Sequence, residues 1–318
     1  MHVNIKLSES ETTKYKNNIV MNTDNQSLFT SGKVALKNGE TLYVHIEGTG
    51  PALFMIHGMW LDHRCFSLLF PHLKEKFTLI APDFRGHGQS SYVTPVKNVD
   101  DLVEDVTLLI EHLKLDKVSF FGWCGGSSVA MKYASAYPEK VDRIVISSPP
   151  WLEGLPLFKP GKEKGEKVLL ESKKDLATHP PLQLLSKAIL EKDRFTLRKI
   201  NEGVNFNLKK PPQEVIDSLV DQSLLTQNVE DLAWAGFTCN LTDRKKGVVE
   251  GSGEILKVQA KVLLFYGEDD SLVPLAAIDE YFDYLGENVT LKVIEDGGHA
   301  VHLLYPKEVS EDVLTFFA

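Results

Sequence analysis

Four apolar runs in the first half of the sequence constrain the fold more than any other feature. They are "ALFMIHG" (residues 52–58), "FTLIAPD" (77–83), "KVSFFGW" (117–123) and "VDRIVISSP" (141–149), and segments with helical spacing separate them. Continuous apolar strands that alternate with helices are typical of a parallel sheet covered on both faces. We therefore predict an α/β fold with a mostly parallel central sheet flanked by helices.

The segments around these runs extend the predicted sheet. Residues 34–48 contain two short alternating runs around Asn38-Gly39, a strong signal for a β-hairpin. A helix is predicted after Asn98, which is a good N-cap residue followed by apolar residues on one helical face. The runs "AKVLLFYGEDD" (260–270) and "VTLKVIEDGGH" (289–299) predict two more strands near the end of the chain.

The pattern of alternating strands and helices stops after Pro149-Pro150 and returns only near residue 256. Within this interval we predict that residues 161–190 and 211–237 are helices interrupted by Pro-Pro pairs. Residues 1–30 are polar and without period, which indicates a loosely ordered N-terminal extension. The predicted organisation is thus an extension (1–30), a core (31–150), a helical insertion (151–255) and the rest of the core (256–318).

Composition excludes several classes of function. The net charge of the 318-residue chain is −9, and its basic residues are scattered among acids, so we expect neither nucleic acid nor an anionic membrane surface as a partner. No apolar stretch approaches the roughly 20 residues of a membrane span. The three cysteines are widely spaced, which fits neither a disulfide framework nor a CxxC metal site. We expect a cytoplasmic protein without a metal or other cofactor; its oligomeric state is left open.

The stretch "FFGWCGGSS" (residues 120–128) contains a candidate nucleophile, Cys124. It joins a predicted strand to a predicted helix, as in the sharp turn called a nucleophile elbow, and glycines flank the cysteine where a Cβ would have no room. A nucleophile that attacks a carbonyl also needs amide donors for the oxyanion. The amide of Gly125 at the helix start is one candidate, and that of Met59, in the "IHGMW" that ends a strand, is the second.

Candidate acids and bases follow the two late strands. "GEDDSLVP" (267–274) offers a carboxylate that could orient an imidazole, and "EDGGHAVH" (295–302) offers two histidines. His299 follows two glycines in a predicted loop and is the candidate base, whereas His302 falls where a helix begins and is assigned to packing. The polar turn "DFRGHGQS" (83–90) is expected to brace the loops around this edge of the sheet.

Taken in order, "HGMW", "DFRGHGQS", "GWCGG", "GEDD" and "GGH" resemble the α/β-hydrolase superfamily. The resemblance implies an α/β-hydrolase fold with residues 151–255 as its cap. It assigns the nucleophile to Cys124, the acid to Asp270 (the fourth residue of Gly-x-x-Asp), the base to His299 and the oxyanion hole to the Met59 and Gly125 amides. Serine is the family's usual nucleophile, whereas dienelactone hydrolases, polyhydroxyalkanoate synthases and some thioesterase domains use cysteine.

Three interpretations of Cys124 stay open: a native nucleophile, a replacement of serine that slows turnover, and a residue of a non-catalytic binding protein on this fold. The leading hypothesis is an enzyme that hydrolyses a carboxylic ester, thioester or lactone of a small-molecule acyl substrate. The alternative is an acyltransferase or cyclase that uses the same acyl-cysteine intermediate. Four tryptophans are available to line an acyl pocket, although core packing also explains them: Trp60, Trp123, Trp151 and Trp234.

Overall fold

The computed structural model describes residues 31–318, so the predicted extension at residues 1–30 lies outside the described part of the chain. An eight-stranded sheet in the order β1-β2-β4-β3-β5-β6-β9-β10 forms its centre. Its strands are β1 (Gly32–Ala35), β2 (Thr41–Gly48), β3 (Ala52–Ile56), β4 (Thr78–Pro82), β5 (Val118–Trp123), β6 (Val141–Ser147), β9 (Lys261–Gly267) and β10 (Val289–Ile294).

Within the eight-stranded sheet, β2 runs antiparallel to both of its neighbours, and the remaining pairs are parallel. β1 and β2 form the predicted antiparallel hairpin, and Gly39 in its turn has a φ of 90°, which a residue with a Cβ rarely adopts. β2 also pairs antiparallel with β4, whereas β3, β4, β5, β6, β9 and β10 pair in parallel. The prediction of a mostly parallel sheet is therefore confirmed.

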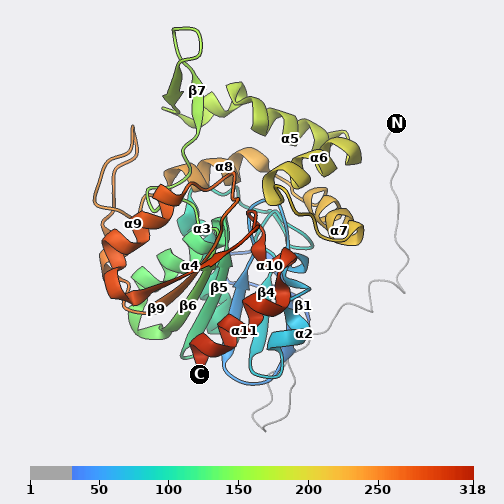
Figure 1. Cartoon of the computed structure of the whole chain (residues 1–318), viewed down its shortest axis with the longest axis vertical. Helices are drawn as coiled ribbons and strands as arrows, with labels where there is room; N and C mark the ends of the chain where they lie inside the picture. Colours follow the sequence, from blue (N-terminus) through green and yellow to red (C-terminus); the bar gives the residue numbers. More distant parts are fainter. Residues whose placement is uncertain (1–30) are drawn as a thin grey trace.

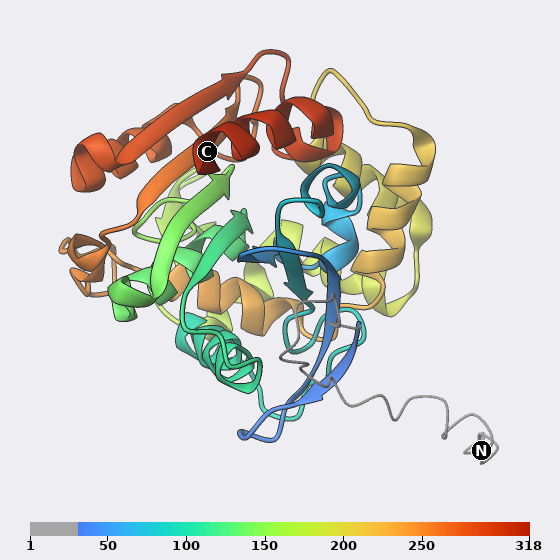
Figure 2. The same ribbon diagram turned by 90° about the horizontal axis from the view of Figure 1, so that it is seen from below.

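Helices cover both faces of this sheet (Figures 1 and 2). The helices around the sheet are α2 (Phe70–Leu73), α3 (Val99–His112), α4 (Gly125–Ala136), α9 (Leu275–Leu285), α10 (Val301–Leu304) and α11 (Pro306–Phe317). Short 3-10 helices lie in the connections between helices and strands: η2 (His63–Phe66), η3 (Pro138–Lys140), η5 (Glu254–Lys257) and η6 (Gly286–Asn288). Apolar side chains of α3, α4 and α9 pack on one face, and those of α2, α10 and α11 pack on the other.

Local sequence signals explain how two of these elements are placed. Asn98 caps α3 as predicted, because its side chain accepts the amide of Asp100 at 3.0 Å. Along β5 successive side chains alternate between the two faces, so Phe120 joins one apolar cluster and Phe121 joins the other. This alternation places Trp123, the last residue of β5, on the face covered by α10 and α11.

The segment between β6 and β9 contains β7 (Phe158–Pro160), β8 (Lys167–Leu169), η4 (Lys173–Thr178), α5 (Pro180–Leu190), α6 (Arg194–Asn205), α7 (Gln213–Ser223) and α8 (Val229–Thr238). Its four helices lie together beyond one end of the central strands (Figure 1), and part of the segment has an apolar cluster of its own. The helix predicted to start at residue 161 is wrong over its first third, where β7 and β8 form a hairpin. Gly165 has a φ of 85° in the turn of this hairpin and breaks the helical pattern. The domain boundaries at residues 150 and 255 stay predictions.

Candidate active site

The turn between β5 and α4 holds Cys124 in a strained conformation, with φ 50° and ψ −122°. Its amide donates to the carbonyl of Ser147 on β6 at 3.0 Å. A Cβ at Gly122 would lie 2.7 Å from the carbonyl oxygen of Gly126, and one at Gly126 would lie 2.1 Å from that of Ile56. The glycines therefore let the main chain pack closely enough to hold this turn, and the Cys124 side chain stays partly exposed.

Asp270 and His299 lie at the same edge of the sheet and are joined by a hydrogen bond. The imidazole Nδ1–H of His299 donates to Asp270 Oδ2 at 2.9 Å, and both side chains are buried. The other carboxylate oxygen of Asp270 accepts the amides of Leu272 and Val273 at 2.9 and 3.0 Å. These bonds fix the carboxylate, and the bond at Nδ1 leaves Nε2 as the nitrogen available for chemistry.

The Nε2 atom of His299 is buried and has no hydrogen-bond partner within residues 31–318. Burial alone would lower the pKa of His299, but interactions with the neighbouring Cys124 and the Asp270 carboxylate outweigh it and raise this pKa to about 10. Burial raises the pKa of Asp270, whereas the charge and hydrogen bond of His299 lower it, and the net direction is down. This arrangement favours a protonated imidazole beside the Asp270 carboxylate.

The two predicted oxyanion donors are neighbours. Gly125 is the first residue of α4, a position whose amide has no acceptor within the helix. A Cβ built on Gly125 would lie 2.8 Å from Cγ of Met59, in the loop after β3. The Met59 side chain also reaches α8, because a Cβ on Gly236 would lie 2.6 Å from its Cε. Met59 thus adjoins both the turn that carries Cys124 and the helix above it.

The four predicted pocket tryptophans lie in different surroundings. Trp123 is only 1% exposed, and its indole N–H donates to the carbonyl of His299 at 3.0 Å. Trp60 is partly buried between the core and the inserted helices, Trp151 packs on the core, and Trp234 packs on the apolar cluster of the insertion. Their role in binding a substrate stays a prediction.

Two buried histidines that sequence reasoning did not single out brace the loops. His57 Nε2 accepts the amide of Phe84 at 3.0 Å, and His87 Nε2 accepts the amide of Trp60 at 3.2 Å. Burial lowers the pKa of both, that of His87 to about 3, so both rings are neutral acceptors. The "DFRGHGQS" turn therefore braces the loop after β3, as its polar residues suggested.

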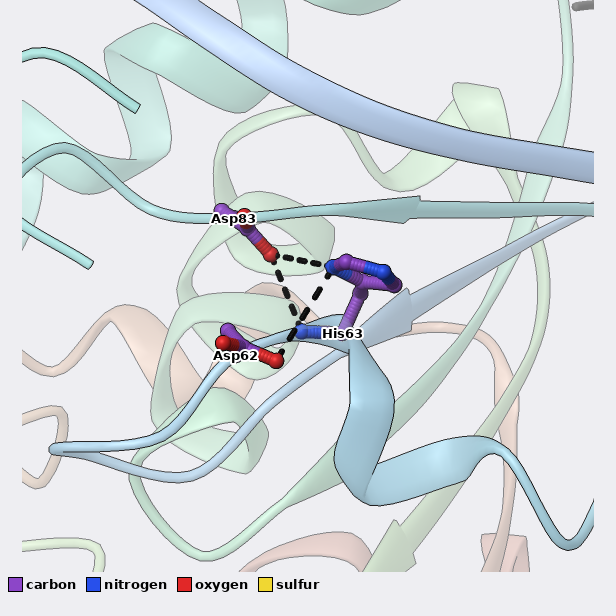
Figure 3. A group of neighbouring side chains, drawn as sticks. All are labelled: Asp62, His63 and Asp83. Carbon is purple, nitrogen blue, oxygen red and sulfur yellow. Dashed lines mark hydrogen bonds and ion pairs between the residues drawn. The ribbon is translucent and has the colours of Figure 1, made fainter. Parts of the chain in front are cut away.

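A second buried cluster contains Asp62, His63 and Asp83 (Figure 3). Their potential ligand atoms lie within 4.8 Å of one another, the spacing of a metal site. Each carboxylate already has protein donors: Asp62 binds the Arg64 guanidinium, and Asp83 accepts the amide and the ring N–H of His63 and the amide of Gln89. Both carboxylates and the imidazole already form hydrogen bonds within the protein, so the cluster fits a structural brace better than a metal centre. The prediction of a site without metal stays untested.

Comparison with known proteins decides the family. Residues 51–306 match the family model described as alpha/beta hydrolase fold. The chain belongs to the alpha/beta hydrolase family. The order of the strands and the helices on both faces agree with that fold, which confirms the resemblance and the fold class predicted from the sequence.

Relatives with recorded names include esterases. An uncharacterised protein of Mycobacterium tuberculosis is 34% identical over 103 residues, a match that covers 32% of this chain and 30% of that protein. The bifunctional esterase/perhydrolase of Acinetobacter calcoaceticus is 24% identical over 291 residues, covering 90% of this chain and 99% of its own. An esterase from Exiguobacterium antarcticum has the same fold, with a TM-score of 0.69 at 18% identity over 89% of this chain and 98% of that structure.

These findings establish the family and leave the chemistry of the site to be argued from its residues. Within residues 31–318 no helix is both long and apolar enough to cross a membrane.

Proposed function

We propose that this alpha/beta hydrolase cleaves a carboxylic ester, thioester or lactone through a covalent intermediate on Cys124. The observation that carries the proposal is the Asp270–His299 hydrogen bond, which leaves an unpaired imidazole nitrogen on a ring whose pKa is raised by the neighbouring Cys124. A nucleophile beside a base that a third group orients is the arrangement that nucleophilic catalysis requires.

The raised pKa of His299 sets the order of the proton transfers. In the proposed mechanism His299, whose pKa is raised, takes the proton of the Cys124 thiol and becomes an imidazolium beside Asp270. The thiolate attacks the carbonyl carbon, and the Met59 and Gly125 amides stabilise the oxyanion. His299 then gives its proton to the leaving oxygen or sulfur, and a thioester remains on Cys124.

Hydrolysis of the thioester completes the cycle. Neutral His299 takes a proton from a water molecule, and the hydroxide attacks the acyl carbon. Collapse of this second intermediate releases the acid and restores the thiolate with its imidazolium partner. Asp270 stays ionised throughout, because it holds the imidazole in one orientation and stabilises its positive charge.

The sulfur at position 124 favours a second candidate function. A thioester reacts more readily with amines and thiols than an oxygen ester does, so an acyltransferase or cyclase could use the same intermediate. Adding an amine or thiol acceptor to the assay separates the two: a transferase diverts the acyl group from acid to conjugate, whereas a hydrolase keeps releasing acid.

A panel of fluorogenic esters and thioesters, assayed with the wild-type protein and Cys124→Ala, tests the proposal. We expect turnover by the wild type, an acyl adduct visible by intact mass spectrometry, and loss of both in the variant. Cys239→Ala is the matched control, because Cys239 is a free thiol that is 4% exposed, whereas Cys124 is partly exposed. Turnover that survives in Cys124→Ala at the wild-type rate overturns the proposal. Cys124→Ser then shows whether an oxygen nucleophile works better at this position.

A further inference from the structure

Trp123 connects the candidate nucleophile to the candidate base. It is the last residue of β5 and directly precedes Cys124 in the chain. Its indole N–H donates to the main-chain carbonyl of His299 at 3.0 Å, across 176 positions of sequence, and both residues are 1% exposed. Because this hydrogen bond is buried, breaking it would leave the indole N–H and the carbonyl without partners, which costs free energy.

The loop that carries His299 needs such a tie, because two glycines precede the histidine. A Cβ at Gly298 would lie 2.9 Å from the carbonyl oxygen of Asn205 at the end of α6, so the loop passes close to the inserted helices. The amide of Ala300 donates to the same Asn205 carbonyl at 3.1 Å. His299 is therefore held from the insertion on one side and by the Trp123 indole on the other.

Packing around the indole keeps it in place without adding a competing charge. The rings of Trp123 and His302 meet edge to face, with centroids 4.6 Å apart. His302 is fully buried; burial and the positive charge of His299 lower its pKa to about 3, so its ring is neutral. The other titratable groups that face the His299 ring are Asp270 and Cys124, the two partners of the proposed mechanism.

We infer that Trp123 is a positioning residue: its indole N–H fixes the His299 main chain so that Nε2 stays aligned with the Cys124 sulfur. The inference rests on the proposed function and adds the residue that sets the geometry of the pair. Small misplacements of a catalytic group lower rates strongly, so loss of this one bond has a measurable effect even though the indole touches no reacting atom.

The test is Trp123→Phe, which keeps an aromatic ring in the core and removes the N–H. The probe is iodoacetamide, with alkylation of the Cys124 peptide followed by mass spectrometry from pH 5 to pH 10; no substrate needs to be known. We expect the variant to react about tenfold more slowly than wild type at pH 6, where a thiolate depends on its imidazolium partner, and at an equal rate near pH 10. With p-nitrophenyl acetate we expect kcat to fall by a similar factor while KM stays unchanged.

Thr78→Val is the matched control. It also removes a buried side-chain donor from a main-chain carbonyl, that of Gly50 at 2.8 Å, but at the start of β4, the end of the parallel sheet opposite Cys124, so we expect it to leave the alkylation profile unchanged. If Trp123→Phe unfolds, β-(3-benzothienyl)alanine at position 123 replaces only the indole N–H by sulfur, and we expect the same tenfold loss.

His299→Ala separates the inference from the proposal beneath it. If His299→Ala slows alkylation at pH 6 but loss of the Trp123 N–H does not, the positioning role is overturned and the proposed function stands. If His299→Ala also reacts like wild type, the Cys124–His299 pair does not exist and both are overturned. An equal loss of alkylation in Thr78→Val also overturns the positioning role, because a general loosening of the core then explains the effect.

Discussion

Two buried aspartate–histidine pairs lie within residues 31–318, and they differ in what surrounds the histidine. The His299–Asp270 pair at the ends of β10 and β9 has a 2.9 Å hydrogen bond and an unpaired Nε2 near a strained cysteine. The His63–Asp83 pair has a shorter bond of 2.6 Å, its aspartate accepts two amides as Asp270 does, and the nearby Cys65 thiol is fully buried, which raises its pKa. Hydrogen-bond geometry alone does not separate a candidate catalytic pair from a structural one; an unpaired nitrogen next to a nucleophile does.

Neighbouring rings add to this contrast. The His63 imidazole stacks at 5.4 Å on His45 and lies 5.1 Å from Tyr43, so aromatic packing holds its faces. His299 has one ring neighbour, Trp123 at 5.9 Å, among the described aromatic pairs. Its orientation therefore depends more on the hydrogen bonds at Nδ1 and at its main-chain carbonyl. We expect the two histidines to differ in activity first and in stability second.

The largest difference should appear in turnover. Replacing His299 by alanine removes both the proton carrier and the partner of the thiolate, so we expect activity on the fluorogenic panel to fall about 10³-fold. His63→Ala should keep wild-type activity per folded molecule. Measuring both rates against the folded fraction from circular dichroism checks this; comparable losses in the two variants would mean that the pairs are not functionally distinct.

Stability should separate the two pairs less than turnover does. His63→Ala and His299→Ala each leave a buried carboxylate, that of Asp83 or Asp270, without its imidazole partner, which costs about 3 kcal/mol. We therefore expect both variants to lower the free energy of unfolding by similar amounts. Urea unfolding of both variants measures the losses, and a loss confined to one of them would contradict this expectation.

Much of the fold was predictable because its signals are local. Continuous apolar runs predicted the buried parallel strands, Asn38-Gly39 predicted the first hairpin, and Asn98 predicted the start of α3. The β7–β8 hairpin was missed because its lysine and glutamate residues have ordinary helix propensity. Only Gly165 marked the turn, and one glycine is a weak signal without tertiary context.

The candidate site was less predictable where it depends on distant residues. Glycine spacing located the turn at Cys124, and the resemblance named Asp270 and His299, whose catalytic roles stay predictions. The His63–Asp83 pair joins residues 20 positions apart and depends on the side-by-side placement of β3 and β4. Likewise, no local pattern indicates that the Trp123 indole reaches the His299 carbonyl, because that contact requires the whole sheet to be assembled.

Acid unfolding should show the smallest difference, because here the two pairs act alike. Burial raises the pKa of both Asp83 and Asp270, but their histidine partners and amide donors outweigh it and lower both values. A carboxylate whose pKa is lower in the folded than in the unfolded chain stabilises the fold above about pH 4 and loses that contribution as the pH falls further. Asp83→Asn and Asp270→Asn should therefore each flatten the fall in stability between pH 5 and pH 3, measured by urea unfolding.

The control is Asp142→Asn, which removes one partner of an exposed ion pair with Lys117 and should not alter the slope of stability against pH. If only one of the two buried variants flattens the profile, the pairs differ in their electrostatics as well as in their neighbours, and the expectation that they act alike in acid is wrong.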